Sequence, residues 1–312
     1  MKKFGFVFPG QGSQKVGMLG AIAEQYPVIN SSFEEASAAL GIDLWAIVSE
    51  DTDGLLNQTH ITQPALLTAS VALWRLWQEQ RGALPELLAG HSLGEYSALV
   101  CADVLSLGDA VKLVHKRGLY MQDAVPAGTG AMAAILGLDD ERILALCEQH
   151  AQGEVVAPAN YNSTGQTVIA GSVAAVERAM AACKEAGAKR ALLLNVSVPS
   201  HCALMLPAAQ RLAGDLEAVV FNTPKVSVVQ NINGRVAKNS EDIKANLLKQ
   251  LYMPVQWVET IGCMWDFGVG QLVECGPGKV LGGLIKRIEP NMETFSLEEL
   301  DSFAQARADI AH

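Results

Sequence analysis

The stretch "ELLAGHSLGEYSALVCA", residues 86–102, combines the signals of a strand, a tight turn and a helix. Its short apolar run at 87–89 predicts a buried strand, and the residues that follow position 93 predict a helix. Between the two stands "GHSLG" (90–94), a G-x-S-x-G pattern. Between a strand and a helix, this pattern is typical of a nucleophile elbow, in which a tight turn exposes a serine, here Ser92. Without that context it would indicate only a glycine-rich turn.

Strands and helices alternate on both sides of this stretch. "FGFVF" (4–8) is short, aromatic and β-branched, and predicts another buried strand. A helix is predicted over 62–82, since Thr62 precedes a proline in the first turn and Gly82 closes the segment. Alternation of this kind indicates a parallel sheet with helices on both faces. The predicted fold class is therefore α/β, with a large α/β-hydrolase-like domain.

The order of elements changes after a loop of small residues at 125–130. The following segments predict strand, helix, strand, strand, helix and strand, which is the order of a ferredoxin-like βαββαβ unit. We therefore predict a small ferredoxin-like domain at 128–197. It is inserted into a large catalytic domain made of 1–127 and 198–312.

Composition narrows the class of protein. The chain has 312 residues, half of them hydrophobic, and a formal net charge of −10. So acidic a chain is not expected to bind nucleic acid through its overall field, and an acidic partner would need a local basic patch. The apolar run at the start is too short for a signal peptide, and no stretch reaches membrane-spanning length. We expect a cytoplasmic monomer with no membrane partner. The six cysteines form no C-x-x-C pattern and lack metal-ligand spacing, so no metal site is predicted.

A nucleophilic serine needs a base within hydrogen-bond reach. His201 is a candidate because it follows the last predicted strand of the insertion, at a junction between domains where clefts form. A structural capping role for His201 is the alternative. His91 precedes Ser92, so its side chain is expected to point the other way. Acids such as Asp103 and Asp123 lie between Ser92 and His201, which leaves a Ser–Asp–His order formally possible.

The glycine-rich segment "PGQGSQ" (9–14) follows the first predicted strand. Loops at the carboxyl ends of neighbouring parallel strands converge on a ligand crevice. Gln11 or a nearby backbone N–H could then face the carbonyl that Ser92 attacks. The segment lacks both the P-loop and the G-x-G-x-x-G spacing, which argues against a nucleotide site.

Arg117 interrupts an apolar stripe on the helix predicted over 106–124. Ala110, Val114 and Met121 make up the rest of this stripe. One interpretation is an arginine whose stem is buried and whose head reaches water. The other is a guanidinium aimed into a cleft, where it would hold a carboxylate with two parallel hydrogen bonds.

Six motifs come in an order that is specific when taken together. They are "FPGQGSQ" (8–14), "GHSLGE" (90–95), Arg117 with Met121, "VPSH" (198–201), "QLYMPVQW" (250–257) and "ECGPGKVL" (274–281). Over nearly the whole chain, from Phe4 to about Ile288, the sequence resembles the malonyl-CoA:acyl-carrier-protein transacylases of bacterial type II fatty acid synthesis. Members of that family also have two domains with a ferredoxin-like insertion.

The resemblance implies roles for individual residues. Ser92 would be the acylated nucleophile and His201 its general base, oriented by the main-chain carbonyl at Gln250 rather than by an acid. Gln11 and the backbone N–H of Leu93 would form the oxyanion hole. The remaining matched positions would bind substrate: Arg117, which would clamp the carboxylate, and Gln63, Met121, Asn160 and Asn162, which would line the pocket. Met253 stands where a polar residue is expected in the family, beside a role that belongs to a main-chain group.

The implied reaction moves a malonyl group from malonyl-CoA to the phosphopantetheine thiol of acyl carrier protein, through a malonyl ester on the serine. It needs no metal and no cofactor, because the thioester supplies the driving force. A thioesterase or esterase using the same serine and histidine is the alternative, and a buried Arg117 would disfavour it. A non-catalytic binding protein is disfavoured because a nucleophile and a base are both present.

Two basic pairs are candidates for binding the acidic carrier protein. They are Lys189 with Arg190, and Lys286 with Arg287. Ordinary solvated surface charge is the alternative for either pair.

Overall fold

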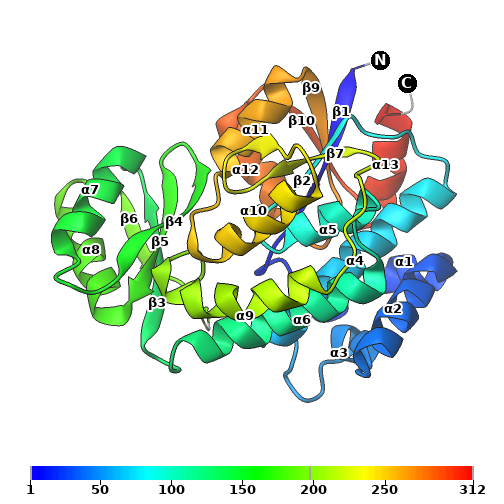
Figure 1. Cartoon of the computed structure of the whole chain (residues 1–312). Helices are drawn as coiled ribbons and strands as arrows, with labels where there is room; N and C mark the ends of the chain where they lie inside the picture. Colours follow the sequence, from blue (N-terminus) through cyan, green and yellow to red (C-terminus); the bar gives the residue numbers. More distant parts are fainter. Residues whose placement is uncertain (1, 197, 311–312) are drawn as a thin grey trace.

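The structure is a computed structural model that describes residues 2–196 and 198–310. It contains a six-stranded sheet that is mostly parallel and a separate four-stranded antiparallel sheet, each packed with helices (Figure 1). The fold is therefore mixed α/β, as predicted. Ser197, where the predicted insertion ends, and the outermost residues of the predicted large domain lie outside the described residues.

The larger sheet has the strand order β10-β9-β1-β2-β7-β8. All of its pairings are parallel except that of β7 with β8. Its strands are β1 (Lys3–Phe8), β2 (Leu87–Gly90), β7 (Ser227–Gln230), β8 (Arg235–Val236), β9 (Val269–Glu274) and β10 (Glu293–Ser296).

Helices cover both faces of this sheet, as the predicted alternation requires. They are α1 (Gly20–Gln25), α2 (Pro27–Leu40), α3 (Leu44–Ser49), α4 (Thr59–Glu79), α5 (Gly94–Cys101), α6 (Leu107–Ala124), α9 (Leu206–Glu217), α10 (Ser240–Tyr252), α11 (Trp257–Asp266), α12 (Val280–Ile288) and α13 (Leu300–Ile310). A short 3-10 helix, η1 (Ala203–Met205), precedes α9. No helix in the described part of the chain is long and apolar enough to cross a membrane.

The central strand β1 shows why the sheet is covered on both faces. Its side chains alternate, so Phe6 packs on one face with Trp74 of α4, at a ring-centroid distance of 5.2 Å. Val7 points to the other face and joins the core that contains Ile261 of α11 and Ile285 of α12. Strands buried on both faces carry apolar residues at nearly every position, which is the pattern of "FGFVF".

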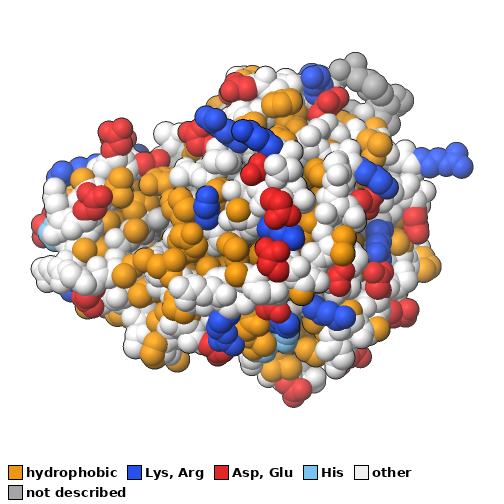
Figure 2. Space-filling view, viewed as in Figure 1, with side chains coloured by type: hydrophobic (Ala, Val, Ile, Leu, Met, Phe, Trp, Pro, Cys, Tyr) orange, Lys and Arg blue, Asp and Glu red, His pale blue; other side chains and the backbone are white. Residues whose placement is uncertain are grey.

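The antiparallel sheet has the order β4-β5-β3-β6. Its elements are β3 (Gly130–Leu136), α7 (Asp140–His150), β4 (Val156–Ser163), β5 (Gln166–Ser172), α8 (Val173–Glu185) and β6 (Arg190–Leu193). They follow one another in the predicted order. Helices α7 and α8 cover one face around a core of their own, and the other face turns toward the larger sheet (Figure 1). Figure 2 shows hydrophobic side chains gathered over this sheet and the start of α9.

The predicted start of α4 was wrong. The helix begins at Thr59 instead of near Thr62, so Pro64 lies inside it. A proline has no N–H to donate to the carbonyl four residues earlier, which here is that of His60. Instead, Nδ1 of His115 from α6 donates a hydrogen bond to this carbonyl at 2.8 Å. The longer α4 is therefore compatible with Pro64, because α6 supplies the missing hydrogen bond. Local helix propensity contains no information about such a contact.

Candidate active site

The turn between β2 and α5 has the geometry of a nucleophile elbow. Ser92 has a φ of 52°, a left-handed value that costs a residue with a side chain about 1–3 kcal/mol. The glycines on either side allow the turn to close. A Cβ on Gly90 would collide with the backbone of Gly94, and a Cβ on Gly94 would collide with the carbonyl of Phe8 in β1. The pattern 90–94 is therefore required by packing as well as by the turn.

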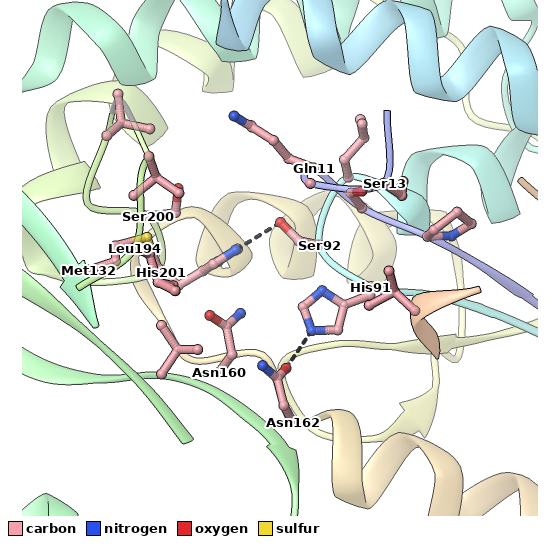
Figure 3. A pocket seen from close by; sticks show the side chains of 18 of the residues that line it. Gln11, Ser13, His91, Ser92, Met132, Asn160, Asn162, Leu194, Ser200 and His201 are labelled. Carbon is pink, nitrogen blue, oxygen red and sulfur yellow. Dashed lines mark hydrogen bonds between the residues drawn. The ribbon is translucent and has the colours of Figure 1, made fainter. Parts of the chain in front are cut away.

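Ser92 and His201 face each other (Figure 3), with 2.8 Å between the serine Oγ and the histidine Nε2. The other ring nitrogen, Nδ1, lies 2.6 Å from the main-chain oxygen of Gln250 at the end of α10. This contact fixes the tautomer, because Nδ1 must donate to the carbonyl and Nε2 is left to accept from the serine. Burial, and then the charge of Arg117, lower the pKa of His201 to about 3, so the imidazole is neutral at physiological pH.

His201 shares a feature with Ser92, namely a positive φ, here of 62°. Its N–H donates to the carbonyl of Leu251 at 3.0 Å, which ties the histidine backbone to α10. The capping role considered from the sequence is not what the side chain does, since both ring nitrogens are engaged with the elbow and with α10. Asp103 and Asp123 are exposed and pair with Lys225 and Arg211, so neither orients the histidine.

Arg117 of α6 is buried, with an exposed fraction of 2%. Its Nη1 donates to Oε1 of Gln63 at 2.8 Å, and its Nη2 lies 3.0 Å from Oε1 of Gln250 and 3.3 Å from Oγ of Ser92. The guanidinium therefore lies beside the nucleophile and does not reach bulk water, which excludes the snorkelling interpretation. It forms no ion pair with a carboxylate among the described residues.

Two backbone N–H groups lie near the serine with no hydrogen-bond partner in the described chain, those of Gln11 and Leu93. They come from the loops that follow β1 and β2, which are adjacent parallel strands. The side chain of Gln11 turns away, with its Nε2 donating to Thr59 at 3.3 Å. Free N–H groups at this position can stabilise a developing oxyanion. For Gln11, the backbone N–H is therefore better placed than the side-chain amide to donate to an oxyanion.

These residues line a cavity of about 620 Å³ between the two sheets. The opposite wall comes from β4, where Asn160 is buried and Asn162 accepts a 2.8 Å hydrogen bond from Nε2 of His91. Asn160 and Asn162 are thus strand residues two positions apart that both face the cavity. Gln63 and Met121 pack together behind Arg117, with 3.7 Å from Nε2 to Sδ.

The predicted orientation of His91 was wrong. Its ring lines the cavity and reaches Asn162, as Figure 3 shows. The alternation of a strand holds only as far as Gly90, and the positive φ of Ser92 then brings two successive side chains to the same space. Burial lowers the pKa of His91, so its ring is neutral as well.

Sequence reasoning missed the polar residues beneath the elbow. Asn231, in the turn after β7, accepts from the N–H of Ser92 at 2.7 Å and donates to the carbonyl of Gly90 at 2.6 Å. The side chain of Gln250 donates to the carbonyl of Ser92 at 3.0 Å and to Oε2 of Glu95 at 3.0 Å. Only the "QLYMPVQW" motif pointed to Gln250, and it did so for the main chain.

The arrangement is suited to acyl transfer. It brings together an activated hydroxyl, a neutral imidazole, two N–H groups for an oxyanion and a buried cation beside them. Among the residues that the structure describes, no group of three or more His, Cys, Asp or Glu side chains is placed to hold a metal ion.

Comparison with known proteins points in the same direction. A family described as "Acyl transferase domain" matches residues 5–282. A malonyl CoA-acyl carrier protein transacylase from Escherichia coli K12 is 58% identical over 306 residues, which cover 98% of this chain and 99% of that protein. A protein of the same name from Bacillus subtilis is 44% identical, over 98% of this chain and 96% of its own length.

Solved structures agree in shape as well as in sequence. An acyl carrier protein S-malonyltransferase from Vibrio cholerae superposes with a TM-score of 0.96 at 56% identity, over 97% of this chain and 99% of the other. A malonyl-transacylase in complex with its type II PKS acyl-carrier protein superposes with a TM-score of 0.97 at 54% identity, over 98% and 99%.

Proposed function

The chain belongs to the acyl transferase family, and from this premise we propose how its cavity performs the transfer. The enzyme is an acyltransferase that moves the malonyl group of malonyl-CoA to the phosphopantetheine thiol of acyl carrier protein. We assign the product, malonyl-carrier protein, to fatty acid synthesis. The observation that carries the residue assignment is the buried guanidinium of Arg117, 3.3 Å from the Oγ of Ser92.

In the first half-reaction, Oγ of Ser92 attacks the thioester carbonyl while Nε2 of His201 takes the hydroxyl proton. The carbonyl oxygen becomes an oxyanion that accepts from the N–H groups of Leu93 and Gln11. The tetrahedral intermediate then collapses, and the carbon–sulfur bond breaks. His201 returns its proton to the CoA sulfur, which leaves as a thiol, and the malonyl group remains as an ester on Ser92.

The second half-reaction repeats these steps with a different nucleophile. His201 deprotonates the pantetheine thiol of the carrier protein, and the sulfur attacks the ester carbonyl. The carbon–oxygen bond to Ser92 breaks, the serine oxygen recovers the proton from His201, and malonyl-carrier protein leaves. The two substrates therefore react in turn at one site, which gives ping-pong kinetics.

Arg117 supports malonyl transfer over simple ester hydrolysis. A buried cation without a paired carboxylate is costly, and a malonyl carboxylate supplies the missing partner through two parallel hydrogen bonds. Gln63 holds Nη1 of this guanidinium, and Met121 packs against Gln63. Asn160 and Asn162 line the opposite wall, where they can contact the acyl group or the pantetheine arm.

We further propose that the chain has two domains, a large α/β-hydrolase-like domain (1–127 and 198–312) and a ferredoxin-like insertion (128–197). Two observations support this division. The small sheet has its own antiparallel order, β4-β5-β3-β6. Gly130 and Pro199, where the chain leaves and returns, lie so close that a Cβ on Gly130 would collide with the proline ring. We place the enzyme in the cytoplasm as a monomer that binds neither nucleic acid nor membrane. The net charge of −10 supports the lack of nucleic-acid binding.

The two basic pairs support a docking site for the acidic carrier protein at one edge of the cavity. Arg287 donates to Oε1 of Gln166 at 2.5 Å, and Gln166 lines the cavity. In the antiparallel sheet, Gln166 and Arg190 both pair with Leu136, from its two sides. The fold therefore brings Lys189–Arg190 and Lys286–Arg287, which are distant in sequence, to the same edge, and all four side chains are exposed.

The test is transfer of isotope-labelled malonyl from malonyl-CoA to holo-carrier protein, measured by the mass of the carrier. The wild type should label the carrier, and Ser92→Ala should not. Continued labelling by Ser92→Ala would place the nucleophile elsewhere, while release of free malonate without labelled carrier would indicate a hydrolase.

A further inference from the structure

Glu95, the second residue of α5, is a buried carboxylate that none of these steps uses. Its exposed fraction is 1%, and no described cation lies within ion-pair distance of it. Its Oε2 accepts from the N–H of Asn231 at 2.9 Å and from Nε2 of Gln250 at 3.0 Å, while Oε1 is buried without a partner. A buried charge that is only partly satisfied lowers stability, which suggests that it is retained for function.

The position of Glu95 matters because of what Gln250 touches. The carboxylate can only accept, so it fixes the amide of Gln250 with its NH2 group toward Glu95 and Ser92 and its oxygen toward Arg117. The main-chain oxygen of the same residue orients His201. Gln250 thus connects Glu95 to the nucleophile, the base and the carboxylate clamp.

Charge gives a second connection. The positive charge of Arg117 acts on both groups, since it favours the charged form of Glu95 and disfavours protonation of His201. When His201 takes the proton of Ser92, a second positive charge forms next to that guanidinium. A negative charge on Glu95 offsets this repulsion in a medium of low dielectric constant.

We propose that Glu95 is a positioning residue of this acyl transfer, which orients Gln250 and supplies the negative charge that stabilises protonated His201. It takes the part that an aspartate plays in Ser–His–Asp triads, but through an intervening glutamine. The proposal rests on the assigned roles of Ser92 and His201.

The proposal predicts a specific pH dependence. Burial raises the pKa of Glu95 to about 7, although the hydrogen bonds from Asn231 and Gln250 and the charge of Arg117 lower it. The other ionisable groups that face it are Tyr96 of α5 and, across Gln250, His201. Below about pH 7 Glu95 becomes neutral and acylation should slow, whereas His201, with a pKa of about 3, does not titrate in this range.

The test is the rate of enzyme acylation between pH 5.5 and 8.5, with malonyl-N-acetylcysteamine as a thioester without phosphate groups. A directly bonded triad carboxylate is worth about 10⁴ in kcat. Since Glu95 acts through Gln250, we expect Glu95→Gln to reduce kcat by about 10-fold to 100-fold. The KM should not rise, and the decline near pH 7 should disappear.

Stability separates this role from a structural one. The folded-state pKa of Glu95 is above its ordinary value of 4.5, so the wild type loses stability as the pH rises from that value to about 7. Removing the charge abolishes this loss, and the Tm of Glu95→Gln at pH 8 should equal or exceed that of the wild type. Glu95→Asp keeps the charge but shortens its reach, so kcat should fall while the decline near pH 7 remains.

Glu274 offers a matched control. It is also buried, its pKa is raised to about 6 by burial, and it accepts from the N–H groups of Leu281 and Gly282 at the start of α12. Glu274→Gln should change the Tm and leave the decline near pH 7 intact.

The proposal is overturned by kcat values within twofold of the wild type in Glu95→Gln or Glu95→Asp, or by an unchanged decline near pH 7 in Glu95→Gln. A lower Tm of Glu95→Gln with a proportional rise in KM would also overturn it, because that indicates a structural role alone. Failure of the assigned Ser92 and His201 roles would appear differently, as a wild type that malonyl thioesters do not label on Ser92.

Discussion

The two sides of the cavity differ in how firmly their polar groups are held. On the elbow side, the N–H, carbonyl and Oγ of Ser92 are all hydrogen-bonded, at 2.7, 3.0 and 2.8 Å. On the β4 side, the pairing with β5 shifts register at two places, and the side chain of Asn160 bonds to no other described residue. The proposed nucleophile is therefore fixed before substrate binds, whereas Asn160 on the opposite wall remains available to the substrate.

Loss of the base should affect the elbow side most. His201→Ala should slow acylation of Ser92 by about two to four orders of magnitude, which is the usual worth of a positioned general base. Rapid-quench measurement of acylation by malonyl-CoA checks this. A near-normal rate would show that His201 is not the general base. The hydrogen bonds that fix Ser92 would then have no role in proton transfer.

The second prediction concerns Arg117, which lies beside the nucleophile and which we propose to set acyl selectivity. Acetyl-CoA leaves its buried charge unpaired, and an unmatched buried charge costs about 3–5 kcal/mol, or roughly a hundredfold or more in rate. Arg117→Ala should lose most malonyl transfer and gain relative activity on acetyl-CoA, as measured by kcat/KM for both thioesters.

Arg117→Lys is the control, because it keeps the positive charge but lacks the planar guanidinium. It should restore little of the malonyl transfer that Arg117→Ala loses. An unchanged ratio of malonyl to acetyl activity in Arg117→Ala would mean that the carboxylate is bound elsewhere, for instance by the β4 wall.

A third prediction moves to the edge of the cavity. Reversing Lys286 and Arg287 to glutamate should reduce kcat/KM for the carrier protein by about tenfold, because rim charges act mainly on the association rate. Acylation by malonyl-CoA should stay unchanged. Lys225→Glu, on an exposed ion pair away from the cavity, is the control. Equal losses in both half-reactions would indicate a folding or pocket defect instead.

The smallest effect is expected on the β4 wall. Asn162→Ala leaves Nε2 of His91 without its 2.8 Å partner, and a lost hydrogen bond of this kind costs about 1 kcal/mol, or roughly fivefold in kcat/KM. A loss as large as that of His201→Ala would show that the wall takes part in the chemistry, and the contrast between the two sides would fail.

Parts of the molecule that follow from local pattern could be predicted from the sequence. The strand–turn–helix around Ser92 and the βαββαβ order depend on apolar periodicity and glycine positions, which are visible in short windows. His201 stood out because it follows the predicted insertion, and Arg117 because it interrupts an apolar stripe. The structure places both within hydrogen-bond distance of Ser92.

The polar network beneath the elbow could not be predicted in this way. Asn231 lies 139 residues after Ser92 and meets it only because β7 pairs with β2. Glu95 resembles an ordinary acidic residue in the first turn of a helix, where charge favours the helix dipole without further function. The orientation of His91 depends on one backbone angle at Ser92, which the strand pattern does not contain.

The most direct test of the malonyl-serine intermediate is the intact mass of the enzyme after mixing with malonyl-CoA alone. An acyl-enzyme mechanism predicts a stable gain of one malonyl group, located on Ser92 by peptide mapping and missing from Ser92→Ala. Release of CoA without a stable adduct, or an adduct that persists in Ser92→Ala, would contradict it.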